Sequence, residues 1–190
     1  MKETIKLALI LFIIASVCTG ILAVGNSFTS VIIEERQAKE LQEALKVVSP
    51  DATEFTPIEA DKLTSLQETL PSVKNMYEAK ADGNVIGYVF DLIGKGGYGG
   101  DISFILGIKS EDKSISGIKI LGHGETPGFG AAIEEPAYAE GVVGATDADG
   151  VKAITGATKT SNAMKNAIKQ AFDAIGQVSA NNTTNYVVSR

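Results

Sequence analysis

The sequence contains no tryptophan, one cysteine and one histidine among its 190 residues. The cysteine, Cys18, lies in an apolar N-terminal stretch, so a disulfide framework and a cysteine-ligated metal cluster are excluded within this chain. The single histidine, His123, likewise excludes a zinc site built from several histidines. If the protein carries electrons, they must therefore reside on an organic cofactor or on a metal held by a partner.

Basic residues are in the minority, since 17 Lys and Arg stand against 23 Asp and Glu and the formal net charge is −6. Nucleic-acid binding needs a basic face, so nucleic acid is not an expected partner. The sequence also has no P-loop and no dinucleotide fingerprint. Glu125 has no second carboxylate nearby in sequence, and His123 has no evident nucleophile partner. We therefore expect neither catalytic residues nor metal ligands in this chain.

Residues 7–24 form an uncharged apolar run that is long enough to cross a bilayer as a helix. We predict a single transmembrane helix at 7–27 in the cell (inner) membrane, after a cytoplasmic N-terminus of residues 1–6. Two lysines precede the run and no charged residue follows before Glu34, so the positive-inside rule places the main domain outside the cytoplasm. The alternatives are a signal peptide cleaved at 23–25 and lipid attachment at the single cysteine.

The remainder of the chain predicts an α+β domain. Residues 28–74 are expected to form a juxtamembrane helical stalk, ending at Ser49-Pro50-Asp51, and a polar connection with one short helix. Residues 75–176 are predicted to form a mixed, mainly antiparallel sheet with flanking helices, and residues 177–190 a flexible tail. The predicted strands are two consecutive pairs of β-prone runs, at 76–80, 85–90, 102–108 and 115–121.

A tight corner at residues 155–158 leads directly into an amphipathic helix. Unpaired N–H groups and the positive end of the dipole favour an anion at such a helix start, most often phosphate. The alternative is that Thr158 or Thr160 only caps the helix. The apolar residues that define the helix recur at helical spacing, and Gly176 is expected to close the run: Ala163, Met164, Ala167, Ile168, Ala171, Phe172 and Ile175.

Two further glycine-rich segments interrupt the β-rich region. The first, at 94–100, contains Tyr98, and so much glycine lets the backbone approach another group closely. The second, at 122–133, combines one carboxylate, Glu125, with one aromatic residue, Phe129, around a Pro-Gly pair. The alternatives are a flexible linker for the first segment and a rigid turn for the second.

In their order and spacing, the three motifs resemble the covalent FMN-binding domain family. Within that family they look most like the G subunit of Rnf electron-transport complexes, a relative of the C subunit of the Na⁺-translocating NADH:quinone reductase. The motifs are Gly97-Tyr98-Gly99-Gly100, Glu125-Thr126-Pro127-Gly128-Phe129-Gly130 and Thr155-Gly156-Ala157-Thr158-Lys159-Thr160. The resemblance implies that Thr158 carries FMN through a phosphoester bond, installed by a flavin transferase that uses FAD. One departure is Lys152, which stands where members of the family commonly have Asp.

The resemblance also implies which other residues contact the cofactor. The loops that contain Tyr98 and Glu125 would border the isoalloxazine ring, with Phe129 or Tyr98 packing on it. The full set of expected contacts besides Thr158 is Thr155, Gly156, Ala157, Thr160, Tyr98, Gly99, Gly100, Glu125, Thr126, Pro127, Gly128 and Phe129.

The function implied by the resemblance is that of a membrane-anchored electron carrier, one part of a larger enzyme rather than an independent catalyst. The whole complex would couple electron transfer between ferredoxin and NAD⁺ to Na⁺ or H⁺ translocation. Its partners would be other membrane subunits, including a second one that bears FMN and a pair that holds an iron–sulfur site. Two alternatives stay open: a stand-alone flavinylated extracytoplasmic carrier or quinone-reductase subunit, and a cofactor-free anchored binding or scaffold domain.

Overall fold

The computed structural model describes residues 2–188, with side chains described over 4–178 except at 22–35 and 37. The chain divides into two units, and the boundary falls after Gln42.

The first unit is helical and belongs to α1, which runs over Lys2–Val48. Its window Thr4–Ile21 has a mean hydropathy of 2.2, and none of it is buried. Within the described residues this is the one helix that is long and apolar enough to cross a membrane. The window overlaps the predicted span at 7–27, of which the side chains of 22–27 lie outside those that the structure describes.

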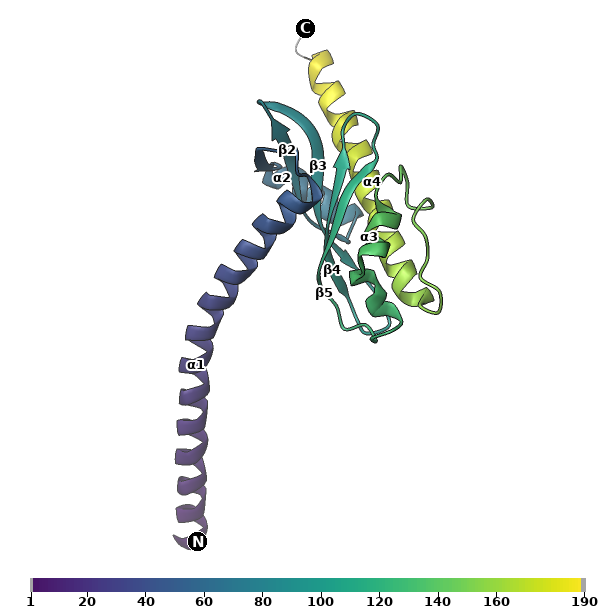
Figure 1. The fold of residues 1–190 in the computed structure, drawn as a ribbon. Coiled ribbons are helices and arrows are strands. Elements are labelled where there is room, and N and C mark those ends of the chain that lie inside the picture. Colours follow the sequence, from purple (N-terminus) through teal and green to yellow (C-terminus); the bar gives the residue numbers. More distant parts are fainter. Residues whose placement is uncertain (1, 189–190) are drawn as a thin grey trace. The chain divides into compact units, whose positions relative to one another are not determined.

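The second unit is built on a five-stranded sheet in which each strand pairs with its neighbours in the chain, in the order β1-β2-β3-β4-β5 (Figure 1). Each of the four strand pairs is antiparallel, so the predicted α+β class with a mainly antiparallel sheet is confirmed. The strands are β1 (Glu54–Pro57), β2 (Val73–Ala81), β3 (Asn84–Gly94), β4 (Ile102–Lys109) and β5 (Ile115–Gly122). The helices are α2 (Ala60–Thr69), the 3₁₀ helix η1 (Gly130–Glu134), α3 (Pro136–Val142) and α4 (Thr158–Val188).

The hydrophobic core lies between one face of the sheet and α4, which runs against β2, β3 and β4 (Figure 1). Alternate strand residues such as Phe90, Phe104 and Leu106 point into this core because successive side chains of a strand face opposite ways. The predicted apolar stripe of α4 supplies the other side, with Met164 and Ile168 fully buried. The spacing of small and branched residues on α4 therefore predicted its buried face correctly.

The last turn of α1 belongs to the second unit and ends, as predicted, before Pro50. Leu45 and Val48 are buried, and the Ser116 hydroxyl on β5 donates a hydrogen bond of 2.6 Å to the Val48 carbonyl oxygen. The domain therefore includes the end of this helix as well as the sheet.

Two details of the predicted architecture are wrong. Strand β1 lies in the segment that we expected to be a connection. The sequence did not predict it because the strand has only four residues, lies at the sheet edge and ends in a proline, so its alternation of apolar and polar residues is weak. Helix α4 does not end at Gly176 but continues to Val188. A helical glycine costs only about 1 kcal/mol relative to alanine, and Val178, which follows shortly after it, is buried in the core. The backbone of the predicted tail is thus helical to 188, and residues 189–190 lie outside the described residues.

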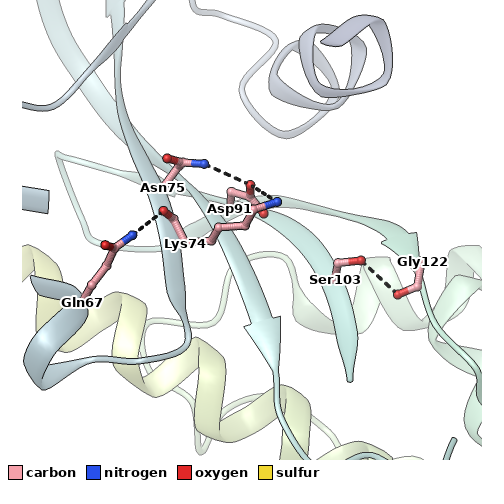
Figure 2. Close-up of polar contacts among 6 residues, drawn as sticks. All are labelled: Gln67, Lys74, Asn75, Asp91, Ser103 and Gly122. Atoms are coloured by element: carbon pink, nitrogen blue, oxygen red, sulfur yellow. Dashed lines mark hydrogen bonds and ion pairs between the residues drawn. The ribbon is translucent and has the colours of Figure 1, made fainter. Parts of the chain in front are cut away.

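Polar contacts also cross the strands (Figure 2). The Asp91 carboxylate on β3 accepts a hydrogen bond from the Asn75 amide at 3.3 Å and lies 3.6 Å from the Lys74 ammonium. On the neighbouring strands, the Ser103 hydroxyl donates to the Gly122 carbonyl oxygen at 3.3 Å. This bond joins β4 to the last residue of β5, where the next loop leaves the sheet.

Candidate functional site

The three glycine-rich motifs meet at one end of the sheet. The register pairs Gly94 with Ile102 and Ser103 with Gly122, so β3 ends, β4 begins and β5 ends at the same place. The loops that follow β3 and β5, together with the start of α4, enclose a pocket of about 460 Å³. Its lining residues are Tyr98, Glu125, Thr126, Phe129, Gly130, Gly156, Ala157, Thr158, Lys159 and Thr160.

Most of the residues expected to contact the cofactor thus lie around one pocket, but the agreement is incomplete. Five of them belong to the same loops without lining it: Thr155, Gly99, Gly100, Pro127 and Gly128. Gly130 and Lys159 line it and were missing from the expected contacts. Both lie inside the motifs, and the position of Lys159 directly after Thr158 was the available signal for its place in the pocket.

The corner before α4 is a hydrogen-bonded turn. The Ala157 N–H donates to the Ile154 carbonyl oxygen at 3.1 Å, and Gly156 has a φ of +81°, which the third position of a type II turn requires. The Ser161 hydroxyl oxygen accepts a hydrogen bond of 2.8 Å from the Ile154 N–H, which ties the corner to the first turn of the helix. Ser161 therefore has a structural role, and glycine at 156 is needed for its backbone conformation.

Thr158 is the first residue of α4, and its side chain is exposed at the pocket. The helical hydrogen bonds begin with the Ser161 N–H, which donates to the Ala157 carbonyl oxygen at 2.9 Å. The N–H groups of Thr158, Lys159 and Thr160 precede that bond and so have no acceptor within the helix. A free hydroxyl, unpaired N–H groups and a lysine therefore lie together, which favours an anion such as phosphate.

Glu125 is buried at the back of this pocket, with 6% of its surface exposed. One carboxylate oxygen, Oε1, accepts a hydrogen bond of 3.0 Å from the Gly99 N–H in the loop after β3. The other, Oε2, accepts a bond of 2.5 Å from the hydroxyl of Thr160, which is itself fully buried on α4. The Glu125 side chain therefore connects all three motifs. The single hydroxyl proton of Thr160 is donated to Glu125 within the protein.

The backbone around Glu125 is packed too closely for side chains. A Cβ on Gly99 would overlap the Gly124 carbonyl oxygen, and a Cβ on Gly130 would overlap Oε2 of Glu125. Glycine at 99 thus reflects close approach of the two loops, and glycine at 130 reflects close approach of the backbone to the Glu125 side chain. The glycine-rich sequence predicted that the backbone approaches another group closely, but it did not identify that group.

Two aromatic side chains stand at the mouth of the pocket in contact with water. Tyr98 is 73% exposed and Phe129 is 58% exposed. The Phe129 ring lies over the corner, since a Cβ built on Gly156 would be 3.6 Å from its Cδ1 atom. Exposed aromatic rings beside a pocket are typical of a surface that a planar ligand covers.

The His123 side chain makes contacts within the loop that follows β5. Its Nδ1 accepts a hydrogen bond of 3.0 Å from the Glu125 N–H, and its Nε2 lies 3.1 Å from a carboxylate oxygen of Glu134. An Nδ1 that accepts from an N–H carries no proton, so Nε2 is the nitrogen that donates to Glu134. Both ring nitrogens are thus engaged in holding the loop.

Comparison with known proteins agrees with the architecture of the chain. A family model described as the FMN-binding domain matches residues 97–173, and a second, described as the RnfG N-terminal region, matches residues 1–48. The G subunit of the ion-translocating oxidoreductase complex of Methanosarcina acetivorans is 31% identical over 182 residues, covering 92% of this chain and 95% of that one.

Two further relatives are more distant in sequence or in structure. The G subunit of the Na⁺-translocating ferredoxin:NAD⁺ oxidoreductase complex of Acetobacterium woodii is 30% identical over 197 residues, covering 94% of each chain. The crystal structure of NqrC from Shewanella oneidensis superposes with a TM-score of 0.46 at 19% identity, over 70% of this chain and 74% of that one. The superposition is too loose to place individual residues.

Proposed function

Because the chain belongs to the family of G subunits of ion-translocating oxidoreductase complexes, we propose that it carries electrons through an FMN covalently bound to Thr158. It is a membrane protein, and its FMN-binding domain makes it an electron-carrying part of an enzyme complex. The observation that carries the proposal for Thr158 is its exposed hydroxyl at the start of α4, inside the pocket that the three motifs enclose.

The pocket suits this cofactor in size and chemistry. Its volume of about 460 Å³ lies within the range usual for small-molecule and cofactor sites. Tyr98 and Phe129 offer aromatic surface to a planar ring, while the start of α4 and Lys159 offer positive charge to a phosphate. When bound, FMN would supply the ability to take up and release electrons singly or in pairs.

Thr158 would be the attachment residue. Its Oγ would bond to the phosphorus of the FMN half of FAD while the bond between the two phosphates of FAD breaks. AMP would then leave, and the hydroxyl proton would pass to the transferase or to water. The resulting phosphodiester carries one negative charge beside unpaired N–H groups and Lys159, so the protein stabilises the product. Covalent attachment would also prevent loss of the cofactor outside the cytoplasm.

Orientation and partners extend the proposal. The lysines before the apolar run and the absence of charge up to Glu34 support a cytoplasmic N-terminus and an extracytoplasmic domain. Other membrane subunits would complete the complex, among them one that bears FMN and a pair that holds an iron–sulfur site. They would exchange electrons between ferredoxin and NAD⁺ and provide the path for Na⁺ or H⁺, because α1 has no charged residue within its apolar run. Protease treatment of intact cells tests the orientation: only an extracytoplasmic domain is digested.

Flavin attachment can be tested directly on denatured protein. The full chain is co-expressed with a flavin transferase and separated on a denaturing gel, where covalent flavin fluoresces in the protein band. Wild type should fluoresce and show a mass increase of one FMN minus one water, and Thr158→Ala should show neither.

Thr146→Ala is the matched control, because Thr146 is an exposed threonine of the same domain that lies outside the three motifs and does not line the pocket. It should keep the fluorescence. A fluorescent Thr158→Ala band would assign the attachment to another residue. A wild-type band without flavin, although the transferase is present and active on another substrate, would favour the cofactor-free scaffold.

A further inference from the structure

We propose that Glu125 is a positioning residue that holds the pocket open before any flavin arrives, and that its charge lowers the reduction potential of the flavin once it is bound. The second half of this inference rests on the proposed function, whereas the first half concerns the protein without cofactor. The carboxylate is buried, and its two oxygens connect segments 26 and 35 residues away in the sequence.

The positioning role follows from what the two bonds join. Gly99 belongs to the loop that carries Tyr98, and Thr160 belongs to the same helical turn as Thr158. Removing the carboxylate would leave the buried Thr160 hydroxyl and the half-buried Gly99 N–H without their acceptor, and a buried hydroxyl is costly to leave unpaired. The loop and the helix start would then be free to separate, and the hydroxyl of Thr158 would lose its fixed place in the pocket.

Two glycines let the backbone approach the Glu125 carboxylate closely. A Cβ on Gly97 would overlap Oε1, and a Cβ on Gly130 would overlap Oε2 and lie 2.6 Å from the Thr160 hydroxyl. The carboxylate therefore lies close to the backbone of Gly97 and of Gly130. The same carboxylate lines the pocket that the three motifs enclose.

The role of charge follows from burial and from the partners. Glu125 takes part in no ion pair among the described residues, and both of its hydrogen bonds come from neutral donors. The carboxylate lines the pocket, so its negative charge acts at short range on a group bound there. A nearby negative charge disfavours the addition of electrons to a bound flavin, so Glu125 would lower the reduction potential.

Two substitutions separate geometry from charge. Glu125→Gln keeps the size of the side chain and can keep both contacts, with the Thr160 hydroxyl turned to accept, but it removes the charge. Glu125→Ala removes the contacts as well. Glu135→Gln is the control, because Glu135 is an exposed acid between η1 and α3 with no hydrogen bond or ion pair through its side chain among the described contacts.

The first readout uses the full chain made without a transferase. Hydrogen exchange over residues 97–100 should be at least tenfold faster in Glu125→Ala than in wild type, and nearly unchanged in Glu125→Gln and Glu135→Gln. The second is the rate of flavinylation by the transferase, which should fall at least tenfold in Glu125→Ala only. Unchanged exchange and flavinylation in Glu125→Ala would overturn the positioning role.

The third readout is the midpoint potential of the flavinylated protein. It should be higher in Glu125→Gln than in wild type, and unchanged in Glu135→Gln. Equal potentials in the two glutamine variants would overturn the role of charge, since a purely structural residue would not move the potential. Failure of the proposed function would look different: wild type itself would carry no flavin, while the exchange experiment would still give its answer.

Discussion

Thr158 and Thr160 lie two residues apart on the same helical turn, yet the structure predicts opposite consequences when each is replaced by valine. Valine keeps the shape and the branching of threonine and removes only the hydroxyl. Thr158 is exposed, so Thr158→Val should change the free energy of unfolding by no more than about 0.5 kcal/mol. It should, however, abolish attachment of the flavin.

Thr160→Val should do the reverse and lower stability. The Thr160 side chain is fully buried, and its hydroxyl donates to a buried carboxylate, so no water can replace the lost bond. Hydrogen bonds to charged groups contribute roughly 1.5–3 kcal/mol. For a chain of this size each kcal/mol shifts the melting temperature by about 2–4 °C, so the expected decrease is roughly 3–12 °C. The hydroxyl of Thr158 stays in place, so some attachment of flavin should persist.

The assay is thermal unfolding of the full chain in detergent, made without a transferase so that bound cofactor does not alter stability. The chain has no tryptophan, and its tyrosines all follow α1. Near-ultraviolet circular dichroism of tyrosine therefore reports on the domain rather than on the membrane helix. Melting temperatures that agree within error for Thr158→Val and Thr160→Val would refute the reasoning, because the bond to Glu125 would then contribute nothing.

Two further predictions concern the backbone and pH. Gly156→Ala should destabilise the domain by about 1–2 kcal/mol in the same assay, because φ is +81° there and the nearest side chain, Phe129, leaves room for a methyl group; an unchanged melting temperature would contradict it. Burial raises the pKa of Tyr138 from 10.0 to about 12, so the folded state favours the protonated phenol. The stabilisation of the folded state by this protonated phenol is complete below pH 10 and is lost as the pH rises to 12. Over that range the free energy of unfolding should therefore fall by roughly 2 kcal/mol more in wild type than in Tyr138→Phe. Parallel pH profiles would rule this out.

Local patterns in the sequence predicted the main elements of the fold because each depends on neighbours in the chain. The hairpin at Asp82-Gly83 and the apolar stripe of α4 are examples, since turn residues and helical spacing act within a few residues. Strand β1 shows the limit: it is short, ends in Pro57, and forms only because β2 offers it an edge. Gly176 shows a second limit of prediction from sequence. Burial of Val178 in the core outweighs the free energy that one glycine costs a helix, so α4 continues past it.

The sequence alone determined the apolar helix near the N-terminus, the α+β class and the motifs that point to Thr158. Each of these depends on composition, on periodicity or on a contiguous motif. Only the tertiary structure decided how the motifs combine, because Glu125 meets Gly99 and Thr160 across strands and loops that are distant in sequence. It also separated two neighbouring hydroxyls by burial, leaving Thr158 exposed at the pocket and Thr160 bonded inside the protein. Burial and hydrogen-bond partners depend on the whole packed domain, and a motif of six residues does not contain them.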